Sequence, residues 1–182
     1  MNASLAMTVA LVVLLLANLL VKLWLSSRQI RHVAQHRDTV PSAFAQTISL
    51  DAHQKAAAYT LAKSRVGLID TALDALVLLG WTLLGGLDWL NQLTLDWMGP
   101  GMTQQLALVV AFALVGGAIG LPLSLYQTFG VEQQFGFNHS TFALWASDLF
   151  KGVLVGLILG LPILWLVLWL MQAGGTLWWL WA

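Results

Sequence analysis

The 182-residue chain has no cysteine, few charged residues and no His-Glu-x-x-His segment. Without cysteine it cannot form a disulfide or a thiolate metal site. Only 9% of its residues are charged, against about 25% in soluble domains. Without His-Glu-x-x-His it lacks the helix face on which a zincin holds its metal and its general base. These absences exclude an ordinary soluble domain and a self-contained zincin active site.

The chain is instead rich in apolar residues. Hydrophobic residues make up 59% of the chain, and the mean hydropathy is +0.79. A chain this short has too little interior to hide so much apolar surface, so lipid must cover much of it. The chain has ten Trp and two Tyr. This excess of Trp agrees with a membrane protein, because indole rings favour the headgroup level of a bilayer. The composition predicts an all-α, polytopic integral membrane protein whose first partner is the lipid bilayer.

Four long apolar segments predict four transmembrane helices within one membrane domain, residues 1–182. The predicted spans are residues 5–25, 66–87, 104–126 and 149–171. Each has roughly the 20 residues that a ~30 Å hydrocarbon core requires. A fifth span starts near Leu177. Residues 88–103 are predicted to form a short outer loop, with its turn at Gly99-Pro100-Gly101.

Lys and Arg residues set the orientation of these spans. Six of the eight lie between Arg28 and Arg65, and the other two are Lys22 and Lys151. Because cytoplasmic segments are rich in Lys and Arg, we expect an outside N-terminus. Residues 26–65 and 127–148 are then the inner loops. We expect no nucleic-acid partner.

Asp70 and Asp74 lie four residues apart within the second predicted span, on one helix face. A carboxylate in hydrocarbon is unfavourable, so both should face protein or water. One interpretation is a polar chamber wall or a proton relay. The alternative is that Asp70 lies shallowly, near the inner end and Arg65, while Asp74 lies one turn deeper.

His32 and His36 share a helix face at i, i+4 spacing. A zincin carries Glu immediately after the first of two such histidines, but Val33 stands there. Zinc sites need three or four ligands, and no third one is nearby. We therefore predict no metal, cofactor or catalytic residue in this chain, and place the histidines among headgroup-level arginines.

Glycines recur at helical spacing in the last two predicted spans. They are Gly116 and Gly120 in one span, and Gly152, Gly156 and Gly160 in the other. Small residues let membrane helices approach closely. The pattern predicts close helix packing and no chemistry.

Four phenylalanines lie in the predicted inner loop: Phe129, Phe135, Phe137 and Phe142. Exposed aromatic side chains need cover, so we expect this loop to dock on a partner or on another part of the same protein. Gly136 allows a tight backbone turn between two of them. Asn138 or Ser140 could cap a following helix, as could Ser147 or Asp148.

Two segments, in this order, resemble the N-terminal membrane domain of the Ste24-type CAAX prenyl proteases, a family of zinc metallopeptidases. His53–Arg65 is similar to bacterial members of that family. Leu121–Thr141 contains Leu-Pro-Leu-Ser-Leu-Tyr, then Glu132, then Phe-Gly-Phe-Asn. Family members often have two acids before Phe-Gly-Phe-Asn, whereas here Gln133 and Gln134 follow the single Glu.

The resemblance implies a helical barrel around a water-filled chamber in the bacterial inner membrane. It also implies a C-terminal metalloprotease domain that binds zinc, closes the inner side and acts on a peptide substrate. We expect this chain to be truncated before every zinc ligand and inactive alone. The candidate chamber or docking residues are Asp70, Asp74, Glu132, Phe135, Gly136, Phe137 and Asn138.

Two other functions remain open. The chain could be a non-catalytic membrane scaffold or regulator that kept the helices of the family. It could instead be a small transporter that uses Asp70 and Asp74. The first alternative predicts neither cleavage nor flux, and the second predicts ion- or proton-coupled flux.

Overall fold

The computed structural model describes residues 3–174, and helices form most of this part of the chain. No strand occurs within it, so the all-α prediction is confirmed. The long helices are α1 (Ala3–His36), α2 (Leu50–Thr82), α3 (Gly86–Met98), α4 (Met102–Leu125) and α6 (Phe142–Gly174). The short ones are η1 (Ser42–Phe44), the π-helical η2 (Tyr126–Glu132) and α5 (Gln133–Phe135). The predicted fifth span near Leu177 lies outside the described residues.

Three helical stretches are long and apolar enough to cross a bilayer: Leu5–His36, Met102–Phe135 and Phe142–Gly174. A fourth, made of α2 and α3, qualifies only as a pair that is bent by 54°. Few side chains are buried, and large apolar ones such as Leu14 are exposed. Exposed apolar side chains are favourable when lipid surrounds them. This exposure therefore agrees with a polytopic membrane protein.

The second span and the following loop differ from the prediction. α2 ends at Thr82, before the predicted end at residue 87. Gly85 then takes a left-handed φ of 78°, and α3 follows directly. The predicted outer loop, residues 88–103, is therefore mostly helical, and its turn is confined to Gly99–Gly101. Apolar residues continue through this region, so hydropathy alone does not mark the bend.

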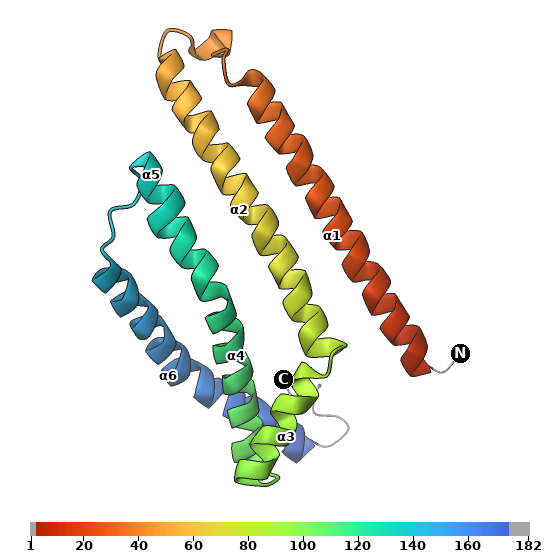
Figure 1. Ribbon diagram of the computed structural model, residues 1–182. Helices are drawn as coiled ribbons and strands as arrows, with labels where there is room; N and C mark the ends of the chain where they lie inside the picture. The colour runs from red at the N-terminus through yellow and green to blue at the C-terminus, as the bar shows by residue number, and fades with distance from the viewer. Residues whose placement is uncertain (1–2, 175–182) are drawn as a thin grey trace. The chain divides into compact units, whose positions relative to one another are not determined.

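Helices α1 and α2 lie side by side and antiparallel (Figure 1). Pro41 and the η1 turn reverse the chain between them. Ser49 begins α2 by accepting a hydrogen bond from the Ala52 N–H at 3.2 Å. The inner loop predicted for residues 26–65 thus consists of two helical extensions, joined by residues 37–49.

The chain divides into two compact units. The first contains the chain up to Leu84 together with Gly120–Asn138, and the second contains Gly85–Ile119 and the chain from His139 onward. In the second unit, the buried Gln104 amide of α4 donates to Asn91 Oδ1 and to Thr94 Oγ1, both at 2.9 Å. These bonds tie the start of α4 to α3.

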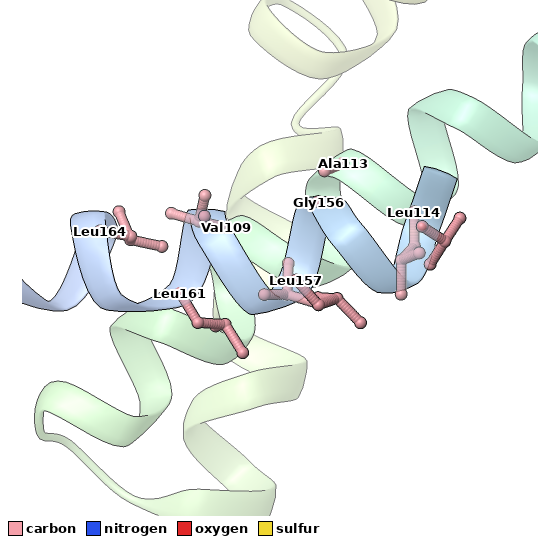
Figure 2. A pocket seen from close by; sticks show the side chains of 10 residues that line it. Val109, Ala113, Leu114, Gly156, Leu157, Leu161 and Leu164 are labelled. Atoms are coloured by element: carbon pink, nitrogen blue, oxygen red, sulfur yellow. The ribbon is translucent and has the colours of Figure 1, made fainter. Parts of the chain in front are cut away.

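The glycine pattern does not produce the predicted close packing. A Cβ built at any of these five glycines meets no atom within 4 Å; they are Gly116, Gly120, Gly152, Gly156 and Gly160. Instead, Gly156 and Gly160 of α6 line an apolar groove of about 360 Å³ with Val109 and Ala113 of α4 (Figure 2). Within the described residues the small side chains leave a space open.

Candidate functional site

A π-helical turn, Tyr126–Glu132, carries the chain from α4 into the aromatic motif. Pro122 in α4 lacks an N–H, so one carbonyl of the preceding turn loses its usual donor. Gly130 lies against the Tyr126 ring, where a Cβ would come within 3.1 Å of a ring carbon. Turns of this type are rare and are frequently found at functional sites. The inner loop predicted for residues 127–148 is helical at both ends, and only residues 136–141 are not.

The Phe-Gly-Phe-Asn motif forms a turn around one carbonyl group. Gly136 ends α5 with a φ of 77°, which glycine adopts without steric strain. The N–H groups of Phe137 and Asn138 both donate to the Glu132 carbonyl, at 2.8 and 3.2 Å. The hydroxyl of Thr141, which accepts from Leu144 N–H at 3.2 Å, is at the start of α6. The prediction that Asn138, Ser140, Ser147 or Asp148 would cap this helix is therefore wrong.

Tyr59 of α2 contacts both phenylalanines of the motif. Its ring centroid lies 5.5 Å from that of Phe135, edge-on, and 4.6 Å from that of Phe137. Aromatic pairs attract at these separations. The Lys63 ammonium lies 5.7 Å from the Tyr59 ring on the same helix. Phe135 is half-buried, whereas Phe137 remains 52% exposed, so the turn presents a fixed and partly open aromatic surface.

Tyr59 is the residue of this site that sequence reasoning missed. It lies within His53–Arg65, a segment that is about 60 residues away from Leu121–Thr141 in the sequence. The structure brings the two segments into contact through the three aromatic rings. The signal available beforehand was that each segment carries aromatic residues outside the apolar spans.

Of Asp70 and Asp74, the two acids of the predicted second span, Asp74 lines a cavity. The cavity has a volume of about 100 Å³ and lies between α1 and α2, with Asn18, Lys22 and Thr71 in its wall. Both acids are exposed, and neither forms an ion pair or hydrogen bond with a described residue. At 1.5 Å per residue, Asp74 lies about 22 Å along α2 from Tyr59. The acids and the aromatic turn are therefore separate sites.

His32 and His36 are close together, and His36 turns its Nδ1 to the backbone. Their ring centroids are 4.2 Å apart, and His36 Nδ1 lies 2.8 Å from the His32 carbonyl. His53 of α2 reaches the His36 carbonyl with Nε2 at 3.1 Å. Within residues 3–174, no three His, Cys, Asp or Glu side chains are grouped to hold a metal ion. In this structure His53 connects α2 to the end of α1, and His32 and His36 contact each other within α1.

Comparison with known proteins gives consistent relatives. The family model described as CAAX prenyl protease N-terminal, five membrane helices, matches residues 29–182. The chain is 30% identical to the CAAX prenyl protease 1 homolog of Mus musculus over 176 residues, 89% of this chain and 36% of that protein. It is also 30% identical to the homolog of Oryza sativa subsp. japonica, over 79% of this chain and 36% of that protein. The chain thus spans little more than a third of these curated relatives.

A solved structure shares the fold. The crystal structure of S. mikatae Ste24p matches with a TM-score of 0.81 at 22% sequence identity. The match covers 89% of this chain and 39% of that chain. At this identity the likeness concerns the helical fold alone.

Proposed function

Because the chain belongs to the family of CAAX prenyl protease N-terminal domains, we propose that it forms the membrane wall of a Ste24-like zinc metalloendopeptidase. It encloses part of a helical chamber. A C-terminal metalloprotease domain of the same protein supplies His-Glu-x-x-His and zinc. A peptide is the substrate of that complete protein.

The aromatic turn, residues 132–138, is the main support for a docking surface on this chain. Tyr59 and the Glu132 carbonyl hold Phe137 in place, yet half of its side chain stays exposed. A preordered aromatic side chain loses little entropy on binding, and aromatic anchors dominate interface energies. We infer that the catalytic domain docks on Glu132, Phe135, Gly136, Phe137 and Asn138.

The groove between α4 and α6 supports a role as a wall that other helices complete. Gly156 and Gly160 keep it open and apolar (Figure 2). In lipid, small residues are where helix backbones approach one another. The family is described as having five membrane helices, and the described residues contain three spans and one bent pair. We infer that a further helix of the same protein fills the groove.

The chamber and its orientation follow from the charged residues. Asp70 and Asp74 contribute polar groups to the chamber, the latter through the cavity that it shares with Lys22. The N-terminus lies outside a bacterial inner membrane, because six of the eight Lys and Arg lie in residues 26–65, which are then cytoplasmic. Residues 127–148 lie on the same side, and Lys151 follows shortly after them. The docking turn is then on the cytoplasmic side, with the catalytic domain.

Coexpression with the C-terminal remainder of a Ste24-type protease tests this function. We expect the two parts to copurify and to cleave a peptide that neither cleaves alone. Phe137→Ala should weaken the association by about 30-fold, the effect of a hot spot of ~2 kcal/mol. Phe150→Ala is the matched control, because Phe150 is also exposed but lies on α6.

Three other outcomes would contradict the proposed function or favour another one. Equal association and cleavage by the Phe137→Ala variant and the parent would remove the docking role. Absence of any association with the remainder would favour a scaffold or regulator. Proton or ion flux in vesicles that disappears with Asp74→Asn would favour a transporter.

A further inference from the structure

A larger cavity in the first unit contains two arginines and no acid. It has a volume of about 460 Å³ and is formed by the end of α1, one face of α2, and the η2 and α5 turns. Arg37 and Arg65 line it, and no Asp or Glu does. Arg65 has no ion pair with a described residue, and Arg37 pairs only with the exposed Asp38, Nε to Oδ1 at 3.4 Å. An exposed ion pair of this kind contributes little to stability, so both guanidinium groups are available to an anion.

The cavity combines two arginines with an apolar wall, and Arg65 directly precedes the apolar Val66. α2 lines it with residues spaced at three and four positions, which cover about 16 Å of one helix face: Ala58, Leu61, Ala62, Arg65, Val66 and Ile69. Arg37 marks the Ala58 end, because the preceding residue, His36, is bonded to His53. At the other end lie Ile69 and the buried Val66, and the buried Val131 adds to the apolar lining.

Further hydrogen-bonding groups line this cavity. Gln134 lies at the Arg37 end, because its neighbour Phe135 contacts Tyr59. Guanidinium groups fit phosphate oxygens in a bidentate manner. A small soluble anion would satisfy the arginines but leave the apolar wall in contact with water. A phospholipid satisfies both, since its headgroup is anionic and its chains are apolar.

We propose that this cavity binds the headgroup of an anionic phospholipid. Its phosphate lies at Arg37 and Arg65, and the first methylenes of an acyl chain run along Val66 and Ile69. The bound lipid joins α1, α2 and the π-helical turn from one side. The cavity shares Phe135 with the docking turn, but lipid binding there does not require the catalytic domain.

Native mass spectrometry of the full chain in detergent with phosphatidylglycerol tests the proposal. We expect one phosphatidylglycerol retained per chain and phosphatidylcholine not retained. Arg37→Gln and Arg65→Gln should each lower retention by about tenfold, a loss of one charge-assisted contact. Arg31→Gln removes the same charge from α1 outside this cavity and should leave retention unchanged.

Ala62→Phe fills the cavity while keeping both arginines, so it tests the site even where an arginine variant does not fold. It should abolish retention, with circular dichroism unchanged. Equal losses in the Arg31→Gln and Arg65→Gln variants would show general charge attraction and overturn the proposal. Displacement of the lipid by millimolar inorganic phosphate would assign the site to free phosphate instead. Retention unchanged by Ala62→Phe would place the lipid elsewhere.

Discussion

Tyr59 connects α2 to a turn that is distant in the sequence, through its contacts with Phe135 and Phe137. We predict that Tyr59→Ala loosens this turn by about 1–3 kcal/mol, because two aromatic pairs of ~0.5–1.5 kcal/mol each are lost. Limited proteolysis in detergent should then cut residues 132–141 faster than in the parent.

Tyr126→Ala is the control for this experiment. Tyr126 is the other tyrosine of the chain, and its side chain is largely exposed. In the Tyr126→Ala variant, cleavage of residues 132–141 should be much slower than in the Tyr59→Ala variant. Cleavage at the parent rate in the Tyr59→Ala variant would show that the backbone bonds to Glu132 hold the turn by themselves.

Gln104 is a buried polar residue whose amide has two partners, Asn91 and Thr94. Gln104→Leu leaves Asn91 Oδ1 without this donor, and an unsatisfied group costs about 1–3 kcal/mol. We predict a lower midpoint of thermal unfolding, followed by tryptophan fluorescence. Gln105→Leu makes the same chemical change at the exposed neighbouring position and should not lower it.

At the scale of elements, hydropathy predicted which segments are helical but not where the second span bends. The apolar run continues past Thr82, so its composition does not change at the break. The bend depends on the backbone of Gly85 in the left-handed region, and most glycines of this chain lie in ordinary helices. Conformation at a single glycine is decided by local geometry that a hydropathy window averages away.

The candidate site was predictable in its residues but not in its contacts. Phe135, Gly136 and Phe137 follow from composition and motif, and Gly136 adopts the positive φ that its position in a turn predicts. The contact with Tyr59 depends on how α2 packs beside η2, which a single sequence does not give. The same holds for Lys22 and Asp74, which come from different helices and line one cavity.

The α1–α2 pair places Asp74 beside polar groups of α1, and we predict that water reaches it. The chain has no native cysteine, so Asp74→Cys gives a single labelling site. A small water-soluble thiol reagent should modify it in membranes. Leu76→Cys is the control, because Leu76 is exposed on α2 but does not line the Asp74 cavity and should face lipid.

If the thiol reagent modified neither Asp74→Cys nor Leu76→Cys, the prediction that water reaches Asp74 would be contradicted. A lipid-facing carboxylate costs roughly 2.5–3.5 kcal/mol on insertion scales, so Asp74→Leu would then stabilise the protein. A destabilised Asp74→Leu variant, together with reactive Asp74→Cys, is the expected combination.

At the scale of the whole molecule, the positive charges are concentrated in one part of the sequence. Seven of the eight Lys and Arg residues lie between Lys22 and Arg65, and the last is Lys151, close after the start of α6. The α3 region and the turn at Gly99–Gly101 carry Asp88 and Asp96 and no Lys or Arg. Such an asymmetry orients membrane proteins with the basic segments in the cytoplasm.

We therefore predict that Ser42→Cys and Pro100→Cys are labelled from opposite sides of the membrane. Both positions are exposed and lie outside the long helices, in the η1 turn and in the turn before α4. In intact cells, an impermeant thiol reagent should modify Pro100→Cys and spare Ser42→Cys until the cells are opened. The parent, which has no cysteine, is the blank. Labelling of Ser42→Cys in intact cells would invert the topology, and it would put the aromatic turn on the opposite side from a cytoplasmic catalytic domain.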